Sequence, residues 1–167
     1  IPVLARVSGL TMTGYGFKGG VGTASRTFDC FTVGGLVQLN CGNKEDLTIS
    51  GLPIGREVVL PKLPEKSSGN SIMMIIATDL NINSRQLWKM AKRAALGLAK
   101  TGSISGNGSG DFTISFSTGE KCLGDLKELT KSRGEAFMNP VYRATVEVIE
   151  EAIVNALFAA ENMIGRD

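Results

Sequence analysis

A serine at position 71 stands where a break in the chain would place a nucleophile and a base on one residue. It follows a polar stretch, residues 61–70, and opens an apolar run, residues 71–79. A serine hydroxyl is a weak nucleophile until a base takes its proton. If the Asn70–Ser71 bond were cut, the new α-amine could be that base, because its reference pKa is about 7.7–8.0. Asn70–Ser71 is therefore a candidate self-cleavage site.

The 167-residue chain contains no histidine. This excludes a Ser-His-Asp or Cys-His site within the chain, and it removes the usual nitrogen ligand of zinc. The bases that remain are carboxylates, lysines with a lowered pKa, and an α-amine. We therefore expect no metal and no cofactor. Composition alone leaves a domain that is not an enzyme equally open.

Charge and cysteine content narrow the class of protein. The formal charge is only +2, so no polybasic surface predicts binding to nucleic acid or an anionic membrane. The longest apolar runs fall well short of the roughly 18 residues typical of a spanning helix. Cys30, Cys41 and Cys122 are odd in number and lack the spacing of metal ligands. They indicate reduced thiols in a reducing compartment, which predicts a cytoplasmic protein.

Residues 14–26 are rich in glycine and end in threonine and serine, so a phosphate-binding loop has to be considered. The order of a P-loop is missing, because Lys18 precedes the Gly19–Gly20 pair instead of following it. A pair of strands hinged at glycines, with its backbone close to another element, is the favoured interpretation.

Two further polar segments lie where a strand ends or begins. Asn40 ends a predicted strand, residues 31–40, before a turn at 41–43; the residues alone favour an asparagine that caps this turn. The Gly- and Ser-rich loop 103–111 leads into another strand. Its spacing is compatible with a linker and with an ordered loop that presents polar groups.

The remaining elements follow from hydrophobic periodicity and end signals. A buried strand is predicted at 71–79, then a helix with Ser84 as N-cap that ends at Thr101–Gly102. A last helix should begin with Asn139 as N-cap and Pro140 at N1, and run from 141 to 163 before Gly165. Shorter strands are predicted at 47–50, 57–60 and 112–117. This order predicts one α+β domain with helices covering the faces of a sheet.

Taken together, several stretches of the chain resemble the L-aminopeptidase/D-Ala-esterase-amidase family of self-cleaving serine peptidases, which look like N-terminal-nucleophile hydrolases. The resemblance covers nearly the whole chain, in the right order. The matching stretches are 17–26, 36–40, 69–71, 76–79, 93–99, 106–111 (Gly-Asn-Gly-Ser-Gly-Asp) and 150–157.

The resemblance implies a four-layer α-β-β-α sandwich whose precursor cuts itself between Asn70 and Ser71. Residues 1–70 would then be the C-terminal part of a larger subunit and residues 71–167 a smaller one, both within one structural domain. Ser71 would be the nucleophile, with its own amine as base. Asn40 would contribute its amide to the oxyanion hole, and Ser109 and Asp111 would hydrogen-bond around the new amine and tune it.

The implied activity is an aminopeptidase or amidase that acts on short peptides, amides or esters with a free amino end. An upstream segment or a companion chain would complete the sandwich, and processed heterodimers would form a homo-oligomer. An acyl transferase similar to ornithine acetyltransferase is the alternative enzyme, although such proteins are expected to expose a threonine. The other alternative is an uncut, non-catalytic binding domain.

Overall fold

The structure, a computed structural model, describes residues 12–28, 31–59, 71–121 and 134–161. Its centre is a four-stranded sheet in the order β3-β4-β5-β6. β3, β4 and β5 pair antiparallel, whereas β5 and β6 run parallel. A small hairpin, β1 (Thr13–Gly14) and β2 (Phe17–Lys18), precedes the sheet. The bounds of the four main strands are Gly20–Thr27 (β3), Thr32–Asn40 (β4), Ser71–Leu80 (β5) and Phe112–Lys121 (β6).

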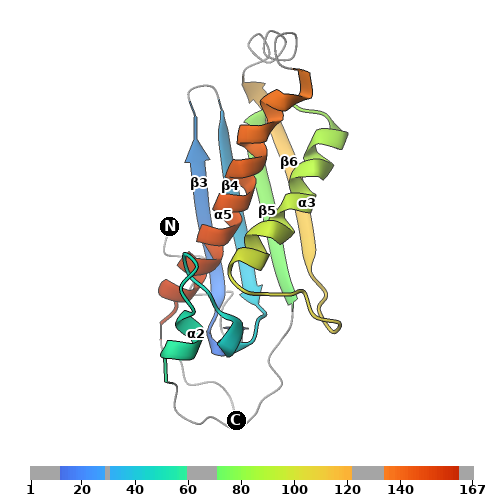
Figure 1. Ribbon diagram of the computed structural model, residues 1–167. Helices are drawn as coiled ribbons and strands as arrows, with labels where there is room; N and C mark the ends of the chain where they lie inside the picture. Colours follow the sequence, from blue (N-terminus) through green and yellow to red (C-terminus); the bar gives the residue numbers. More distant parts are fainter. Residues whose placement is uncertain (1–11, 29–30, 60–70, 122–133, 162–167) are drawn as a thin grey trace.

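Two long helices, α3 (Ser84–Lys100) and α5 (Asn139–Phe158), lie on one face of this sheet (Figure 1). α3 is the crossover between the parallel strands β5 and β6, and α5 packs over β3 and β4. The strands show the burial alternation of a half-covered sheet; in β4, Val33, Val37 and Leu39 are fully buried beneath the helices. The mixed α and β content and the helix-covered sheet confirm the predicted α+β class.

Glycine allows α5 to approach the sheet closely. A Cβ atom on Gly22 in β3 would lie 1.9 Å from the carbonyl oxygen of Ala152 in α5, and one on Gly35 in β4 would lie 3.0 Å from the Val148 side chain. The face of α5 toward these glycines is buried and consists of Val141, Thr145, Val148, Ile149, Ala152, Ile153 and Ala156. The glycine-hinged strand pair expected from the sequence is thus confirmed.

Gly22→Ala is expected to destabilise the protein at the upper end of the roughly 1–3 kcal/mol range seen for overpacked cores, because the clash is with helix backbone. Gly35→Ala is the matched control on the next strand. Its Cβ atom would lie 3.0 Å from the Val148 side chain, a contact that a displacement of a few tenths of an ångström would relieve, so it should lower the melting temperature far less. Equal melting temperatures for the two variants would contradict this account of the helix–sheet contact.

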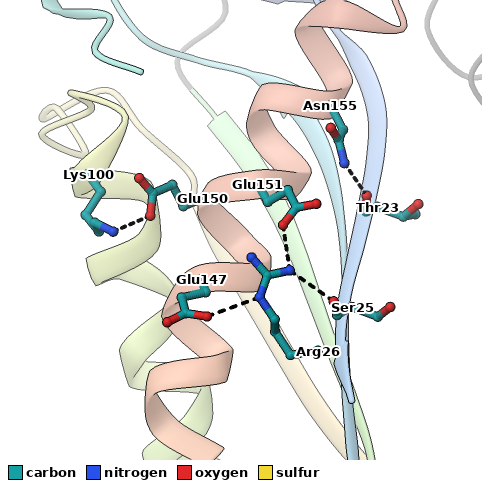
Figure 2. Close-up of polar contacts among 8 residues, drawn as sticks. All are labelled: Thr23, Ser25, Arg26, Lys100, Glu147, Glu150, Glu151 and Asn155. Atoms are coloured by element: carbon teal, nitrogen blue, oxygen red, sulfur yellow. Dashed lines mark hydrogen bonds and ion pairs between the residues drawn. The ribbon is translucent and has the colours of Figure 1, made fainter. Parts of the chain in front are cut away.

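Polar side-chain contacts tie α5 to β3 and to α3 (Figure 2). Arg26 of β3 forms ion pairs with Glu147 at 3.1 Å and with Glu151 at 2.6 Å. Lys100 at the end of α3 pairs with Glu150, and Asn155 Nδ2 donates to the carbonyl of Thr23 at 2.9 Å. The side chains of the Arg26 pairs are 34% to 43% exposed, so these ion pairs contribute little stability.

The other face of the sheet carries an apolar surface that no described element covers. β5 and β6 pair Met73 with Phe112, Ile75 with Ile114, and Ala77 with Phe116, so these side chains share that face. Phe112 and Ile114 are 61% and 54% exposed. A surface of this kind marks a place for a packing partner.

The predicted strands at 47–50 and 57–60 are not found in the described residues. Instead of a strand at 47–50, the backbone and side chain of Thr48 bond to Thr101 and Lys100 at the end of α3, and Ser50–Gly51 form a tight turn at positive φ. Instead of a strand at 57–60, residues Ile54–Glu57 form the single-turn helix α2, and Val58 N–H bonds back to Ile54. A 3-10 turn, η1 (Lys44–Asp46), packs against it.

Both predicted N-caps were displaced by one residue. Asn83, not Ser84, caps α3: its side chain accepts from Gln86 N–H, and Gln86 Oε1 accepts from Asn83 N–H, both at 3.0 Å. α5 begins with Asn139 itself, because the 3-10 turn η2 (Gly134–Met138) runs directly into it. Gly102 at φ +98 ends α3 as predicted. Leu60, Met163 and Gly165 lie outside the described residues.

Among the described residues, no helix is both long and apolar enough to cross a membrane. Within the same part of the chain, no cluster of three or more His, Cys, Asp or Glu side chains could hold a metal ion.

Candidate active site

Three strand ends meet at one edge of the sheet and bring the predicted site residues together. β4 ends at Asn40, its antiparallel neighbour β5 begins at Ser71, and these two residues are register partners. β6 runs parallel to β5 and begins just after Asp111, so its first residue lies beside Met73. The end of β4 and the starts of β5 and β6 therefore lie at the lower end of the sheet in Figure 1. Asn70 lies outside the described residues.

Ser71 is half-buried at the first position of β5. Its Oγ accepts a hydrogen bond of 3.0 Å from the backbone N–H of Gly110. Since Oγ is the acceptor in this contact, its own proton remains available for a base. A Cβ atom on Gly110 would lie 3.4 Å from Ser71 Oγ, an ordinary van der Waals distance, so the contact depends on the backbone N–H and not on the absence of a side chain.

Asn40 is placed with its amide in a defined orientation. The backbone N–H of Thr13 donates to Asn40 Oδ1 at 3.1 Å, which leaves Nδ2 as the donor end of the amide. Register partners in antiparallel strands have Cα atoms about 4.5–5.5 Å apart and side chains on the same face. Asn40 Nδ2 can therefore stabilise negative charge that develops on an oxygen next to Ser71. The turn-capping alternative fails here, because the bond goes to residue 13.

Asp111 lies against the start of β5. Its Oδ1 accepts from Ser109 Oγ at 2.5 Å and from the backbone N–H of Ile72 at 3.1 Å. Its Oδ2 is buried and, within the described part of the chain, has no hydrogen-bond partner. A buried carboxylate oxygen without a donor costs free energy, so Asp111 Oδ2 can accept a further hydrogen bond. The 103–111 loop is therefore ordered around polar groups and is not a linker.

Cys41, directly after Asn40, is too deeply buried to act as a nucleophile. It is 2% exposed. Burial raises the pKa of its thiol to about 12, with a further contribution from the nearby Asp111 carboxylate, while a hydrogen bond from Ser103 acts in the opposite direction. The thiol is therefore neutral at physiological pH. Cys41 is free, as predicted, whereas Cys30 and Cys122 lie outside the described residues.

The glycine-rich segment is not a phosphate loop. Lys18 lies on β2, and its Nζ donates to the carbonyl oxygens of Gly19 at 2.8 Å and Met12 at 3.4 Å. Burial lowers the pKa of its ammonium group. These two hydrogen bonds tie the Lys18 side chain to the backbone before and after the hairpin.

Sequence reasoning missed two contributions made by backbone N–H groups, those of Gly110 and Thr13. Neither can be identified from residue type, since the donor is common to almost every residue. Gly110 could have been suspected only from its place between Ser109 and Asp111.

Comparison with known proteins identifies the family of the chain. The sequence pattern of peptidase family S58 matches residues 7–167. The beta-peptidyl aminopeptidase BapA of Sphingosinicella xenopeptidilytica is 38% identical over 177 residues, which covers 94% of this chain and 44% of that protein. The chain thus spans about half the length of the curated relatives it matches.

Solved structures give the same result. The L-aminopeptidase D-Ala-esterase/amidase of Ochrobactrum anthropi, described as a variant of the Ntn hydrolase fold, superposes with a TM-score of 0.76 at 37% identity, covering 95% of this chain and 45% of that one. The PH0078 protein of Pyrococcus horikoshii OT3 has the same TM-score and coverage at 44% identity. Since the family pattern extends over nearly all of the sequence, and the fold agrees, the chain belongs to peptidase family S58.

Proposed function

We propose that this chain is the catalytic part of a self-processing aminopeptidase or amidase, with Ser71 as nucleophile and its own α-amine as base after cleavage of the Asn70–Ser71 bond. The substrates are short peptides, amides or esters with a free amino end. Family membership and the aminopeptidase activities named for the relatives support this proposal.

The observation that carries the proposal is the unpartnered Asp111 Oδ2. Asp111 Oδ1 already binds the N–H of Ile72, the residue next to Ser71. The nitrogen of Ser71 is one residue away along the backbone, so a free amine there would lie within reach of the same carboxylate. Cleavage would convert an amide nitrogen with one proton into an amine with more protons to donate, and Asp111 Oδ2 would accept one of them.

Maturation would proceed by an N-to-O acyl shift. Ser71 Oγ attacks the carbonyl carbon of Asn70, the C–N bond breaks, and the nitrogen takes up the hydroxyl proton. Water then hydrolyses the resulting ester, which leaves a carboxylate on Asn70 and a free hydroxyl and amine on Ser71.

The same groups would then serve the substrate. The neutral amine takes the Ser71 Oγ proton as the oxygen attacks the substrate carbonyl, and Asn40 Nδ2 binds the oxyanion. The protonated amine returns the proton to the leaving amine, and water hydrolyses the acyl-enzyme. Gly110 N–H keeps Oγ in position in the ground state.

The direct test is the mass and chemistry of the purified full-length protein. We expect two fragments whose smaller member begins at Ser71, together with release of p-nitroaniline from α- and β-aminoacyl anilides. A single intact chain without hydrolysis would support the non-catalytic binding domain. Acetyl transfer from an acetylated donor to ornithine, without anilide hydrolysis, would support the acyl transferase.

Asp111→Asn should move the acid limb of the activity–pH profile to lower pH. The base works as a neutral amine, and a carboxylate beside it stabilises the ammonium form and so raises the pKa of the amine. Removing the negative charge lowers that pKa, and the expected displacement is about one to three pH units. Ser109→Ala, which keeps the carboxylate, should move the profile less. An unchanged acid limb in Asp111→Asn would show that Asp111 does not tune the amine.

We further propose that the apolar face of the sheet is covered by a second sheet, which would complete the four-layer α-β-β-α sandwich. An upstream segment or a companion chain would supply it, and substrate would bind between the two sheets, because Ser71 and Asn40 lie on that face. Assembly of processed heterodimers into a homo-oligomer and a cytoplasmic location remain predictions from the sequence.

A further inference from the structure

The β1–β2 hairpin contains a tyrosine in an unfavourable backbone conformation. Gly14 pairs with Phe17, so Tyr15 and Gly16 are the two turn residues, and both have positive φ, +52° and +73°. These values are typical of a type I′ turn, whose first position favours asparagine, aspartate or glycine. A bulky side chain there requires support from its surroundings, and such residues concentrate at functional sites.

That support comes from the Tyr15 side chain, which is completely buried. Its hydroxyl lies 2.7 Å from Thr101 Oγ1. Because Thr101 gives its only hydroxyl proton to the carbonyl of Leu98, the phenol must donate to Thr101. The backbone of Ser103 also hydrogen-bonds to the phenol oxygen. Room for the ring depends on Gly42, where a Cβ atom would lie 2.3 Å from Tyr15 Cε1.

Tyr15 thereby connects the segment that holds Asn40 with the loop that carries Ser109 and Asp111. Its backbone N–H bonds to the carbonyl of Cys41 at 2.9 Å, next to Asn40. Two residues earlier in the same hairpin, Thr13 N–H holds Asn40 Oδ1. At the other end of the side chain, Thr101 and Ser103 begin the loop that carries Ser109 and Asp111.

We propose that Tyr15 is a positioning residue, whose buried hydroxyl anchors the hairpin so that Thr13 N–H orients the Asn40 amide toward Ser71. The inference rests on the proposed function and adds to it, because it assigns the orientation of the oxyanion donor to a residue that never touches substrate.

The test is a double-mutant cycle in the full-length protein, with hydrolysis of an aminoacyl ester measured per cut chain. Tyr15→Phe should lower kcat by about 10- to 100-fold, the range expected from a misplaced catalytic group, with KM changed less than about twofold. In an Asn40→Ala background the same change should have no further effect on kcat. Thr101→Val removes the same hydrogen bond from the other side, and should reproduce both results.

Tyr142→Phe is the matched control, since Tyr142 is the other tyrosine of the chain, is 9% exposed, and lies in α5 under Arg93. It should leave kcat unchanged, and melting temperatures of both variants separate a loss of stability from a loss of positioning.

Equal losses of kcat for Tyr15→Phe with and without Asn40 would overturn the positioning role, as would wild-type kcat in both Tyr15→Phe and Thr101→Val. Failure of the proposed function would look different: wild-type protein without hydrolysis, or full activity in Asn40→Ala.

Discussion

Ser71→Ala should yield a single uncut polypeptide with no hydrolase activity. The substitution removes the only atom that can attack the Asn70 carbonyl in the proposed acyl shift, and it also removes the nucleophile of the mature enzyme. We expect activity to fall to the background of the assay. Intact mass, N-terminal sequencing and anilide hydrolysis check the two effects separately.

The matched control is Ser84→Ala, which changes an exposed serine at the first turn of α3. It should be cut and active like the wild type. Ser71→Cys keeps a nucleophile at the same position and should retain some cutting. Normal fragments from Ser71→Ala would assign the break to a contaminating protease, and normal turnover would require another nucleophile.

The second large effect is expected for Asn40→Ala. One oxyanion donor contributes about 2.7–4 kcal/mol to transition-state stabilisation in other hydrolases, so kcat should fall by about 10²- to 10³-fold. Self-cleavage should slow as well, because its tetrahedral intermediate forms at the same place. The measurement is kcat per cut chain, together with the rate at which uncut protein disappears.

Two further variants serve as comparisons for Asn40→Ala. Asn40→Asp has nearly the same shape but replaces the donor with a negative charge, and it should be at least as impaired as Asn40→Ala. Gln38→Ala lies two residues earlier on the same face of β4 and should change kcat by less than a few-fold. A loss confined to KM in Asn40→Ala would mean that the amide binds substrate in the ground state instead of the oxyanion.

The proposed self-cleavage and the proposed amine base depend on each other through Asp111. If the uncut chain leaves Asp111 Oδ2 buried and unpartnered, cleavage supplies a donor and should stabilise the fold as well as create the base. Under the proposed function, a single bond cleavage would therefore both satisfy the buried carboxylate oxygen and create the base.

The sequence was most informative where a pattern is long and local. The strands at 31–40, 71–79 and 112–117 are confirmed, because alternation or a continuous apolar run over several residues leaves few other structures possible. The N-cap of α3 could have been predicted correctly: Gln86 stands three residues after Asn83 and can complete a capping box, whereas Leu87 stands three residues after Ser84.

Local patterns failed where distant contacts decide. Residues 47–50 alternate like a strand, but Thr48 finds its hydrogen-bond partners at the end of α3, more than 50 residues away. The helix α2 at 54–57 is a single turn, and Gly55 packs so closely on Lys44 that a Cβ atom would lie 1.6 Å from its carbonyl oxygen. Such tertiary contacts override propensity in short segments.

By itself, the sequence determined which chemistry was possible. The absence of histidine restricts the general base to few groups, because protonation at neutral pH depends on residue type. The serine at the start of an apolar strand marks the candidate nucleophile. Only the tertiary structure decided how Asn40, Ser71 and Asp111 meet, since strand pairing brings together ends that are 31 to 71 residues apart. It also decided which backbone N–H groups act, because every residue but proline carries one and only position distinguishes them.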